Sequence, residues 1–231
     1  MAMARVKFDC TPERYGQEPS IIHVRNPFKS AHFFHRDAQF TIMTKTALLI
    51  IDMQNDFIRQ GAPLRVKDGE GIIANIRSAL DLFRSRGLPV FHILRVQRAD
   101  GSDVEISRRK LFQKTPFAVE GTVGARVIDE LEPHPGEYII RKNRMSAFFN
   151  TDLDLLLRSL RVERLVITGI QTPNCIRTTA FDAFAYNYQV YLVDDAVAAQ
   201  DDGIHRANVR DMTNIGIGII RTANLGQIVG E

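Results

Sequence analysis

Three side chains with complementary chemistry stand at the ends of apolar runs that have the length of β-strands. Asp52 follows the run TALLII, Lys142 ends YIIRK, and Cys175 lies a few residues beyond VITGI. A cysteine thiolate is a nucleophile, a carboxylate can accept the thiol proton, and an ammonium group stabilises negative charge nearby. Parallel strands present their carboxyl ends at one edge of a sheet, where ligands bind. The sequence therefore predicts nucleophilic catalysis at that edge.

None of the three residues indicates catalysis by itself. Asp52 could cap a helix or form a structural ion pair, Lys142 could be a solvated lysine, and Cys175 could be a small buried hydrophobe, as most free cysteines are. The prediction depends on finding them together. A helix expected to begin near Cys175 favours its thiolate, and a neighbouring ammonium would lower the thiol pKa further. Backbone N–H groups at the same helix start could bind an oxyanion.

The elements that must position these residues alternate between strands and helices. Apolar runs predict six strands, at 46–51, 88–94, 138–142, 164–170, 189–195 and 215–221. Helices are predicted over 70–86, from Thr151 onward, over 173–188, near 201–213 and at the C-terminus. This alternation indicates an α/β fold with a doubly wound, Rossmann-like parallel sheet of about six strands and helices on both faces.

Composition narrows the classes of protein to which the chain can belong. Of 231 residues, 45% are apolar and 25% are charged, as in an average globular protein. The 30 basic and 27 acidic residues are interspersed, so we expect no nucleic-acid partner. No apolar run is long enough to span a membrane, and the N-terminus has no secretory signal. With only Cys10 and Cys175, no disulfide framework is expected, which indicates a reduced, cytoplasmic protein.

Three blocks of the sequence resemble the isochorismatase-like cysteine hydrolases. They are ALLIIDMQNDF at 47–57, IIRKNRMSAFFNTDLD at 139–154 and LVITGIQTPNCIRTTAFDAF at 165–184, in the order that the family has. The resemblance implies a hydrolase domain over 46–231. Residues 1–45 are then an N-terminal extension that packs on this domain or on a neighbouring subunit. A homo-oligomer, either a dimer or a tetramer, is also implied.

The same resemblance implies a catalytic triad of Asp52, Lys142 and Cys175. It further implies a cis peptide bond between Ile170 and Gln171, with the backbone N–H groups of Gln171 and Cys175 forming an oxyanion hole. In such a site the thiolate attacks an amide or ureido carbonyl. A thioester or thiocarbamate forms and is then hydrolysed, and the reaction needs neither a metal nor another cofactor.

The sequence also discriminates among the activities of that family. Isochorismatases proper lack the nucleophilic cysteine, so Cys175 argues against that activity. Nicotinamidases have a metal site made by an aspartate and two histidines after the second strand, whereas 92–103 (HILRVQRADGSD) contains His92 alone, inside the strand. We therefore expect no metal. The stretch KNRMSAFFNT resembles members that act on ureidoacrylate, which favours a small ureido or carbamoyl substrate.

Substrate contacts can be suggested only as candidates. Phe57 and Phe148 adjoin the triad blocks and could form walls of the pocket. A substrate carboxylate could pair with an arginine, and the candidates are Arg95, Arg98, Arg144 and Arg177. Structural interpretations are given to Asp194 and Asp195 (strand end and turn cap), to His205 (helix surface) and to Thr151 with Asp154 (capping box).

Two hypotheses from other classes remain to be weighed. A nucleotide-binding oxidoreductase should have a G-x-G-x-x-G turn after the first strand, where DMQNDF stands instead. A redox protein should pair Cys175 in a C-x-x-C motif, and it has no such partner. A non-catalytic protein that binds a small molecule on the same fold stays open as an alternative, since fold does not fix function.

Overall fold

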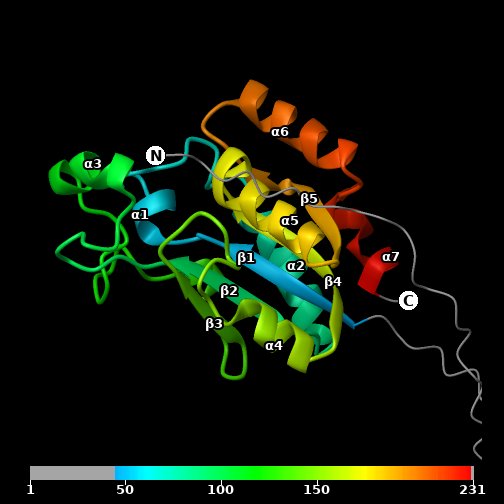
Figure 1. Ribbon diagram of the computed structural model, residues 1–231. Helices are drawn as coiled ribbons and strands as arrows, with labels where there is room; N and C mark the ends of the chain where they lie inside the picture. Colours follow the sequence, from blue (N-terminus) through cyan, green and yellow to red (C-terminus); the bar gives the residue numbers. More distant parts are fainter. Residues whose placement is uncertain (1–44, 230–231) are drawn as a thin grey trace, which may run out of the picture. The chain divides into compact units, whose positions relative to one another are not determined.

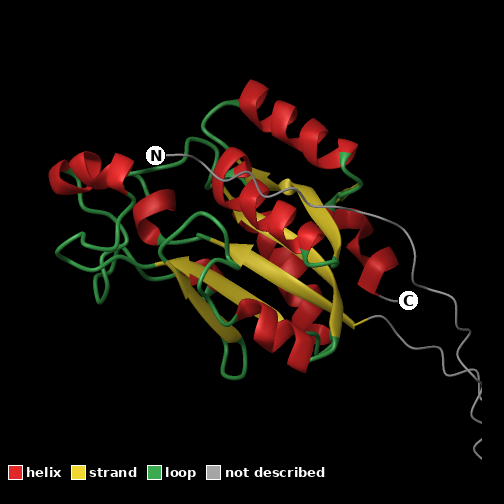
Figure 2. Ribbon diagram, in the orientation of Figure 1, coloured by secondary structure: helices red, strands yellow, loops and turns green. Residues whose placement is uncertain are grey.

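The computed structural model describes residues 45–229, which contain one six-stranded sheet. Its strand order is β3-β2-β1-β4-β5-β6, and every neighbouring pair is parallel (Figure 1). Helices cover both faces (Figure 2). The predicted doubly wound α/β fold is therefore confirmed. The predicted N-terminal extension lies outside the described residues apart from Lys45, with which β1 begins.

All six predicted strands are present, with small shifts at their ends. They are β1 (Lys45–Ile51), β2 (Val90–Arg95), β3 (Tyr138–Lys142), β4 (Val162–Ile170), β5 (Gln189–Ala198) and β6 (Gly218–Ile220). The prediction that Asp194 and Asp195 end the fifth strand is wrong, because β5 continues to Ala198. Asp195 instead accepts hydrogen bonds from the backbone N–H and the hydroxyl of Thr222, both at 2.9 Å.

The helices divide between the two faces of the sheet. Those on one face are α2 (Ile73–Ser85) and α7 (Leu225–Val229), and those on the other are α4 (Leu153–Ser159), α5 (Arg177–Ala185) and α6 (Asp202–Asn214). Beyond the carboxyl ends of the strands lie α1 (Asn55–Ile58) and α3 (Arg109–Lys114) (Figure 1). Short turns complete the described chain, namely η1 (Ile106–Arg108), η2 (Asp129–Leu131), η3 (Thr172–Ile176) and η4 (Thr222–Asn224). None of the described helices combines the length and apolar character that crossing a bilayer requires.

Two helix predictions need correction. The helix expected over 173–188 begins with the π-helical turn η3 and ends at Ala185. The capping box at Thr151 does not form, because α4 begins at Leu153 and the Thr151 hydroxyl donates to the carbonyl of Ala147. Asp154 accepts a hydrogen bond from the Tyr188 hydroxyl at 2.7 Å instead. Thr151 thus keeps local partners, whereas Asp154 has a tertiary one.

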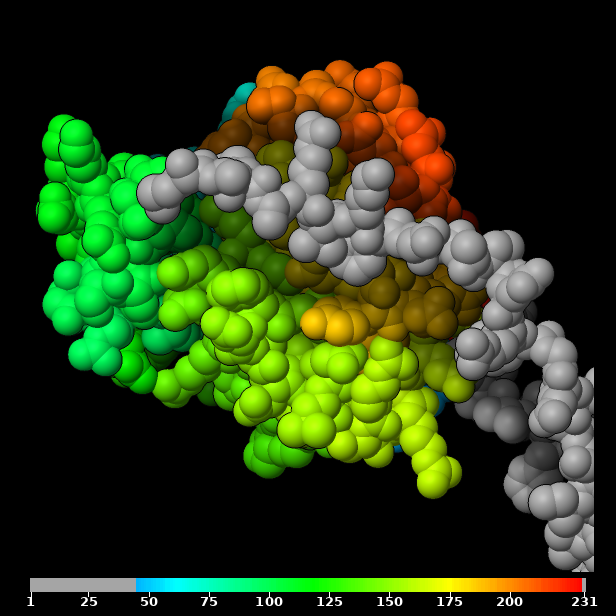
Figure 3. All heavy atoms as spheres, viewed as in Figure 1, coloured from blue at the N-terminus to red at the C-terminus, as the bar shows by residue number. Residues whose placement is uncertain are grey.

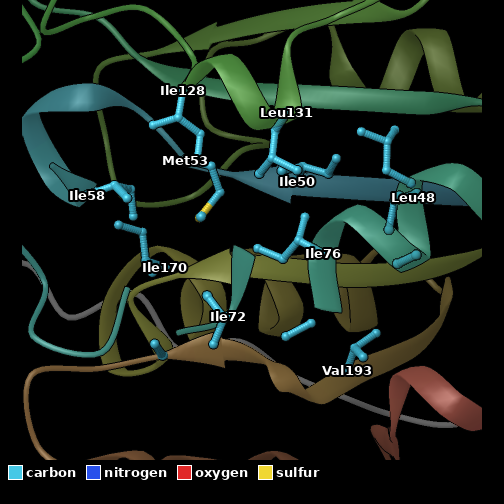
Figure 4. Close-up of a cluster of buried hydrophobic side chains, with 14 of the residues drawn as sticks. Leu48, Ile50, Met53, Ile58, Ile72, Ile76, Ile128, Leu131, Ile170 and Val193 are labelled. Atoms are coloured by element: carbon cyan, nitrogen blue, oxygen red, sulfur yellow. The ribbon is translucent and has the colours of Figure 1, made fainter. Parts of the chain in front are cut away.

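The core lies on both faces of the central strand β1. Leu48 and Ile50 point into the cluster under α2, whereas Leu49 and Ile51 point into the cluster under α4 and α5. Figure 4 shows part of the first cluster, where Ile76 of α2 faces the strands. A strand buried on both faces requires an uninterrupted apolar run, and this is why its sequence was a strong signal.

The connection between β2 and β3 is held against the end of β1 by buried polar contacts. Gln54 Nε2 donates to the carbonyls of Arg95 and Ala125, both at 2.8 Å, and its Oε1 accepts from the Arg95 N–H. The Asp56 carboxylate accepts from the Ala118 N–H at 2.7 Å. In the space-filling view this connection, in green, projects from one side (Figure 3). These contacts explain the polar sequence that directly follows β1.

Candidate active site

Asp52, Lys142 and Cys175 meet at the carboxyl edge of the sheet. Lys142 Nζ donates to Asp52 Oδ2 at 2.9 Å and to Cys175 Sγ at 3.3 Å. All three residues are buried, with exposed fractions of 4%, 3% and 6%. Asp52 directly follows β1, Lys142 ends β3 and Cys175 lies in the turn after β4, so elements distant in sequence bring them together. A buried ammonium between a carboxylate and a thiol offsets the cost of removing these charges from water.

The backbone at Asp52 has an uncommon conformation. Its φ of 54° lies in the left-handed region, where aspartate is one of the few tolerated residues besides glycine. Ile51 pairs with Gly169 of β4, and a side chain at Gly169 would overlap the backbone of Ile51. The strand end and its carboxylate can approach β4 only because position 169 is glycine. Asp52 Oδ1 is buried and has no hydrogen-bond partner among the described residues.

Cys175 lies in η3, two residues before α5 begins. The peptide bond between Ile170 and Gln171 that leads into this turn is cis. The carbonyl of Gln171 accepts from the backbone N–H groups of Asn174 and Ile176, at 3.0 and 3.2 Å, which closes the turn around the cysteine. The hydroxyl of Thr179 in α5 accepts a hydrogen bond from the Ala147 N–H at 3.0 Å. This contact holds the residues after β3 against the helix.

The thiol of Cys175 is less acidic than the sequence suggested. Burial raises its pKa, the Asp52 carboxylate raises it further, and the Lys142 ammonium only partly opposes them, so that the pKa reaches about 11. The expectation of a resting thiolate is therefore wrong. The sequence placed the cysteine near a helix start, where the dipole favours the thiolate, but it could not show that the thiol is buried. In the resting state the sulfur carries its proton.

A narrow cavity of about 40 Å³ adjoins the thiol. Six residues from the sequence analysis line it: Asp52, Phe57, Arg95, Ile170, Gln171 and Cys175. Four others that had not been singled out also line it, namely Leu64, Arg108, Met145 and Asn174. Pockets for drug-sized ligands measure roughly 300–1,000 Å³, so this one suits a compact substrate.

The charge of Arg95 is balanced within the protein. Its Nη2 lies 2.5 Å from both carboxylate oxygens of Glu105 and 3.3 Å from the carbonyl of Asn143. Burial disfavours the charged guanidinium, but the hydrogen bond and attraction of Glu105 outweigh it and raise the pKa of Arg95. The candidate contact with a substrate carboxylate thus already has a partner.

The structure does not bring the other candidate contacts to the cavity. Phe148 packs in the core, with its ring centroid 5.3 Å from that of Tyr186. Arg177 lies over Phe181 and 3.7 Å from Asp211 of α6. Of the remaining arginines, Arg98 is exposed beside Asp100, and Arg144 donates to the carbonyl of Asp103. Neither of these two lines the cavity.

His205 is more than a helix-surface residue. Its side chain is 17% exposed, its Nδ1 lies 3.0 Å from the Thr172 hydroxyl, and its Nε2 lies 3.3 Å from Asp194 Oδ1. It therefore links α6 to the turn that holds Cys175. No local pattern could have found this contact, because the two residues are 33 positions apart and meet only through the packing of α6.

The described residues do not fit the metal site that the comparison with nicotinamidases raised. Within 45–229 no three His, Cys, Asp or Glu side chains are grouped as metal ligands. His92 lies within β2, and its Nε2 is 2.9 Å from Glu137 Oε2, ahead of β3. Burial lowers the pKa of His92. Its partner stands at the amino end of β3, away from the Cys175 edge.

Comparison with known proteins identifies relatives over most of the chain. A family model described as the isochorismatase domain matches residues 46–224. A probable inactive nicotinamidase of Arabidopsis thaliana is 47% identical over 176 residues, which cover 74% of this chain and 90% of that protein. The ureidoacrylate amidohydrolase RutB of Pantoea ananatis is 34% identical over 171 residues, covering 66% of this chain and 68% of that protein.

A solved structure has the same architecture. The isochorismatase family protein of Desulfovibrio vulgaris aligns with a TM-score of 0.78 at 43% identity, covering 81% of this chain and 100% of that one. The match to the family model spans Asp52, Lys142 and Cys175. The chain belongs to the isochorismatase family of hydrolases.

Proposed function

We propose that this protein is a cysteine-dependent amidohydrolase that cleaves the C–N bond of a small ureido or carbamoyl compound. The observation that carries the proposal is the contact of the Lys142 ammonium with both the Asp52 carboxylate and the Cys175 thiol, beside a cavity. Similarity to an enzyme named ureidoacrylate amidohydrolase supports the substrate class.

Asp52 is the base in the first step. It is the only carboxylate among the described residues that line the cavity, and its Oδ1 is free of other hydrogen bonds there. Because the resting sulfur is protonated, the thiol proton passes to Asp52 as Sγ bonds to the substrate carbonyl carbon. The carbonyl oxygen becomes an oxyanion, which the backbone N–H groups of Gln171 and Cys175 bind. Lys142 stabilises the negative charge that moves between carboxylate and sulfur.

The second half of the reaction returns the proton and adds water. Asp52 gives its proton to the departing nitrogen as the C–N bond breaks, leaving an S-acyl or S-carbamoyl Cys175. A water molecule then gives a proton to Asp52 while its oxygen attacks the same carbon. The C–S bond breaks and the sulfur regains its proton. The sum is one substrate and one water giving an amine or ammonia and an acid.

Ammonia release from a panel of compounds tests this proposal. The panel contains ureidoacrylate, N-carbamoyl amino acids, biuret, nicotinamide and a simple amide, each assayed with wild type, with Cys175→Ala and with a chelator. We expect turnover of a ureido compound that persists with the chelator and disappears in Cys175→Ala. Equal turnover by Cys175→Ala would contradict the role of the thiol.

The alternative is a protein that binds a small molecule without hydrolysing it. The raised pKa of Cys175 favours this alternative, and one relative carries the name probable inactive nicotinamidase. Silence of the folded wild type across the panel, together with binding of a ureido compound, would decide for it. As part of the hydrolase proposal, we also propose a cytoplasmic location, which would keep the thiol reduced. We further propose that the chain assembles into a dimer or tetramer.

A further inference from the structure

Two arginines line the cavity, and their charges are balanced differently. Arg95 is paired with Glu105 through two contacts of 2.5 Å. Arg108, at the end of η1, forms no ion pair with any described carboxylate. Its guanidinium carbon lies 5.1 Å from the centroid of the Phe117 ring. The guanidinium of Arg108 thus packs on an aromatic ring and has no ion-pair partner among the described residues.

The surroundings of Arg108 make this arrangement costly without an anion. Burial lowers the pKa of Arg108 and repulsion by Arg95 lowers it further, and the attraction of Glu105 and Asp52 only partly opposes them. A guanidinium nevertheless keeps its proton in proteins, so the cost cannot be relieved by deprotonation. A bound carboxylate would relieve it, because the planar guanidinium can donate two parallel hydrogen bonds to the two oxygens.

We infer that Arg108 binds a carboxylate of the substrate, so that the protein takes short ureido or carbamoyl acids in preference to neutral ureas and amides. The identity of the reacting group rests on the proposed function. Arg108 and Cys175 line the same narrow cavity from different segments, one after β2 and one after β4. Because both residues line one cavity of about 40 Å³, a substrate bound by both would have its carboxylate only a few bonds from the carbonyl that reacts with Cys175. Arg108 is therefore the residue that selects for charge.

A binding experiment in the Cys175→Ala protein tests Arg108 without requiring turnover. The probes are N-carbamoylglycine and isobutylurea, which have the same number of heavy atoms and differ in charge. We expect calorimetry to show that Arg108→Met weakens N-carbamoylglycine about 10- to 100-fold, the loss of a charge-assisted hydrogen bond, and leaves isobutylurea within about twofold. The affinity of Arg108→Lys for N-carbamoylglycine should lie between those of the arginine and methionine proteins, because lysine keeps the charge but cannot donate two parallel hydrogen bonds.

The matched control is Lys110→Met, which removes the same charge from an exposed position two residues away. It should leave the affinity for both probes unchanged. Unaltered binding of isobutylurea also shows that a variant has folded with its cavity intact. Equal affinity of the two probes, no affinity for the acid, or equal losses for both in Arg108→Met would overturn the inference.

Turnover assays with proteins that retain Cys175 distinguish failure of this inference from failure of the proposed function. If wild type hydrolyses ureas but Arg108→Met lowers kcat/KM equally for the acid and for isobutylurea, the role of Arg108 fails and the hydrolase stands. If wild type hydrolyses neither these probes nor any compound of the panel while acid binding still depends on Arg108, the hydrolase fails and the carboxylate site stands.

Discussion

The two edges of the sheet each have a cluster of charged side chains, half-buried at the amino edge and buried at the carboxyl edge, and the two clusters differ in what their carboxylate does. At the amino edge, Glu137 accepts hydrogen bonds from Arg84 at 2.7 and 3.0 Å, lies 2.9 Å from His92 Nε2 and accepts from the His134 N–H at 2.8 Å. Both of its oxygens are thereby occupied. At the carboxyl edge, Asp52 uses one oxygen on Lys142 and keeps the other without a partner among the described residues.

The cavities at the two edges differ in the opposite sense. The amino-edge cavity, lined by Arg84, His134 and Glu137 among others, measures about 440 Å³, whereas the one beside Cys175 measures about 40 Å³. Cavity size alone would favour the amino edge as the place where a substrate binds. Chemistry favours the carboxyl edge, because the thiol that we propose as the nucleophile lies there beside a carboxylate with unused capacity to accept a proton. The comparison therefore supports the carboxyl edge as the proposed reactive edge on the unpaired oxygen of Asp52, and not on cavity volume.

The largest effect should follow from Asp52→Asn, which removes the proposed base at the carboxyl edge. Turnover of a ureido compound should fall at least about 10⁴-fold. Alkylation of Cys175 by iodoacetamide at pH 8 should become faster, because the Asp52 carboxylate raises the thiol pKa. The assays are ammonia release and the rate of alkylation, with Cys175→Ala to correct for Cys10. A slower alkylation would show that Asp52 does not oppose the thiolate.

Lys142→Met should have the next largest effect and should separate catalysis from thiol acidity. We expect turnover to fall about 10²- to 10³-fold, the range for a single stabilising donor. Alkylation should become slower, because the ammonium lowers the pKa of Cys175. Removing one partner of a buried pair should also cost about 3–5 kcal/mol of unfolding free energy. Urea unfolding measures that loss, and Lys110→Met serves as the control. Faster alkylation would contradict the assignment.

The carboxyl edge was predictable because its residues are attached to strong local signals. Asp52 and Lys142 each end a run whose apolar pattern fixes a strand, and parallel strands align their ends. Six strands and the faces of the sheet followed from the same pattern. The sequence could not predict the acidity of Cys175, because the raised pKa depends on burial beside Asp52 in the finished fold.

The sequence analysis could not identify residues whose positions depend only on tertiary contacts. Arg108 belongs to the long connection between β2 and β3, whose path depends on Gln54 and Asp56 rather than on any periodic pattern. In the sequence it is part of a charged run with Arg109 and Lys110. His205 likewise meets Thr172 only when α6 packs beside η3. Local rules place elements, whereas these contacts need the finished fold.

Glu137→Gln tests whether the charged cluster at the amino edge contributes to stability and not to turnover. It should leave turnover within about twofold of wild type, since Glu137 lies ahead of β3 and away from Cys175. It should lower the unfolding free energy by about 2 kcal/mol, because the half-buried Arg84 loses its carboxylate partner. Urea unfolding and ammonia release measure the two effects. The exposed Glu163→Gln is the matched control, and a large loss of turnover in Glu137→Gln alone would show that the two edges are coupled.

Acid should remove the same stabilisation without a mutation, and this is the smallest expected effect. Burial opposes ionisation of Glu137, but hydrogen bonds from Arg84, the His134 N–H and His92 outweigh it and lower the pKa of Glu137 from 4.5 to about 2. A carboxyl group with a lowered pKa in the folded state contributes full stability above its unfolded pKa and loses it as the pH falls toward the folded value. The stability difference between wild type and Glu137→Gln should therefore shrink by about 1 kcal/mol from pH 6 to pH 3, after allowance for solvent screening. Urea unfolding of both proteins at pH 6, 4.5 and 3 measures it. A difference that stays constant over this range would mean that Glu137 stabilises the amino edge through its shape and hydrogen bonds, and that its charge contributes nothing.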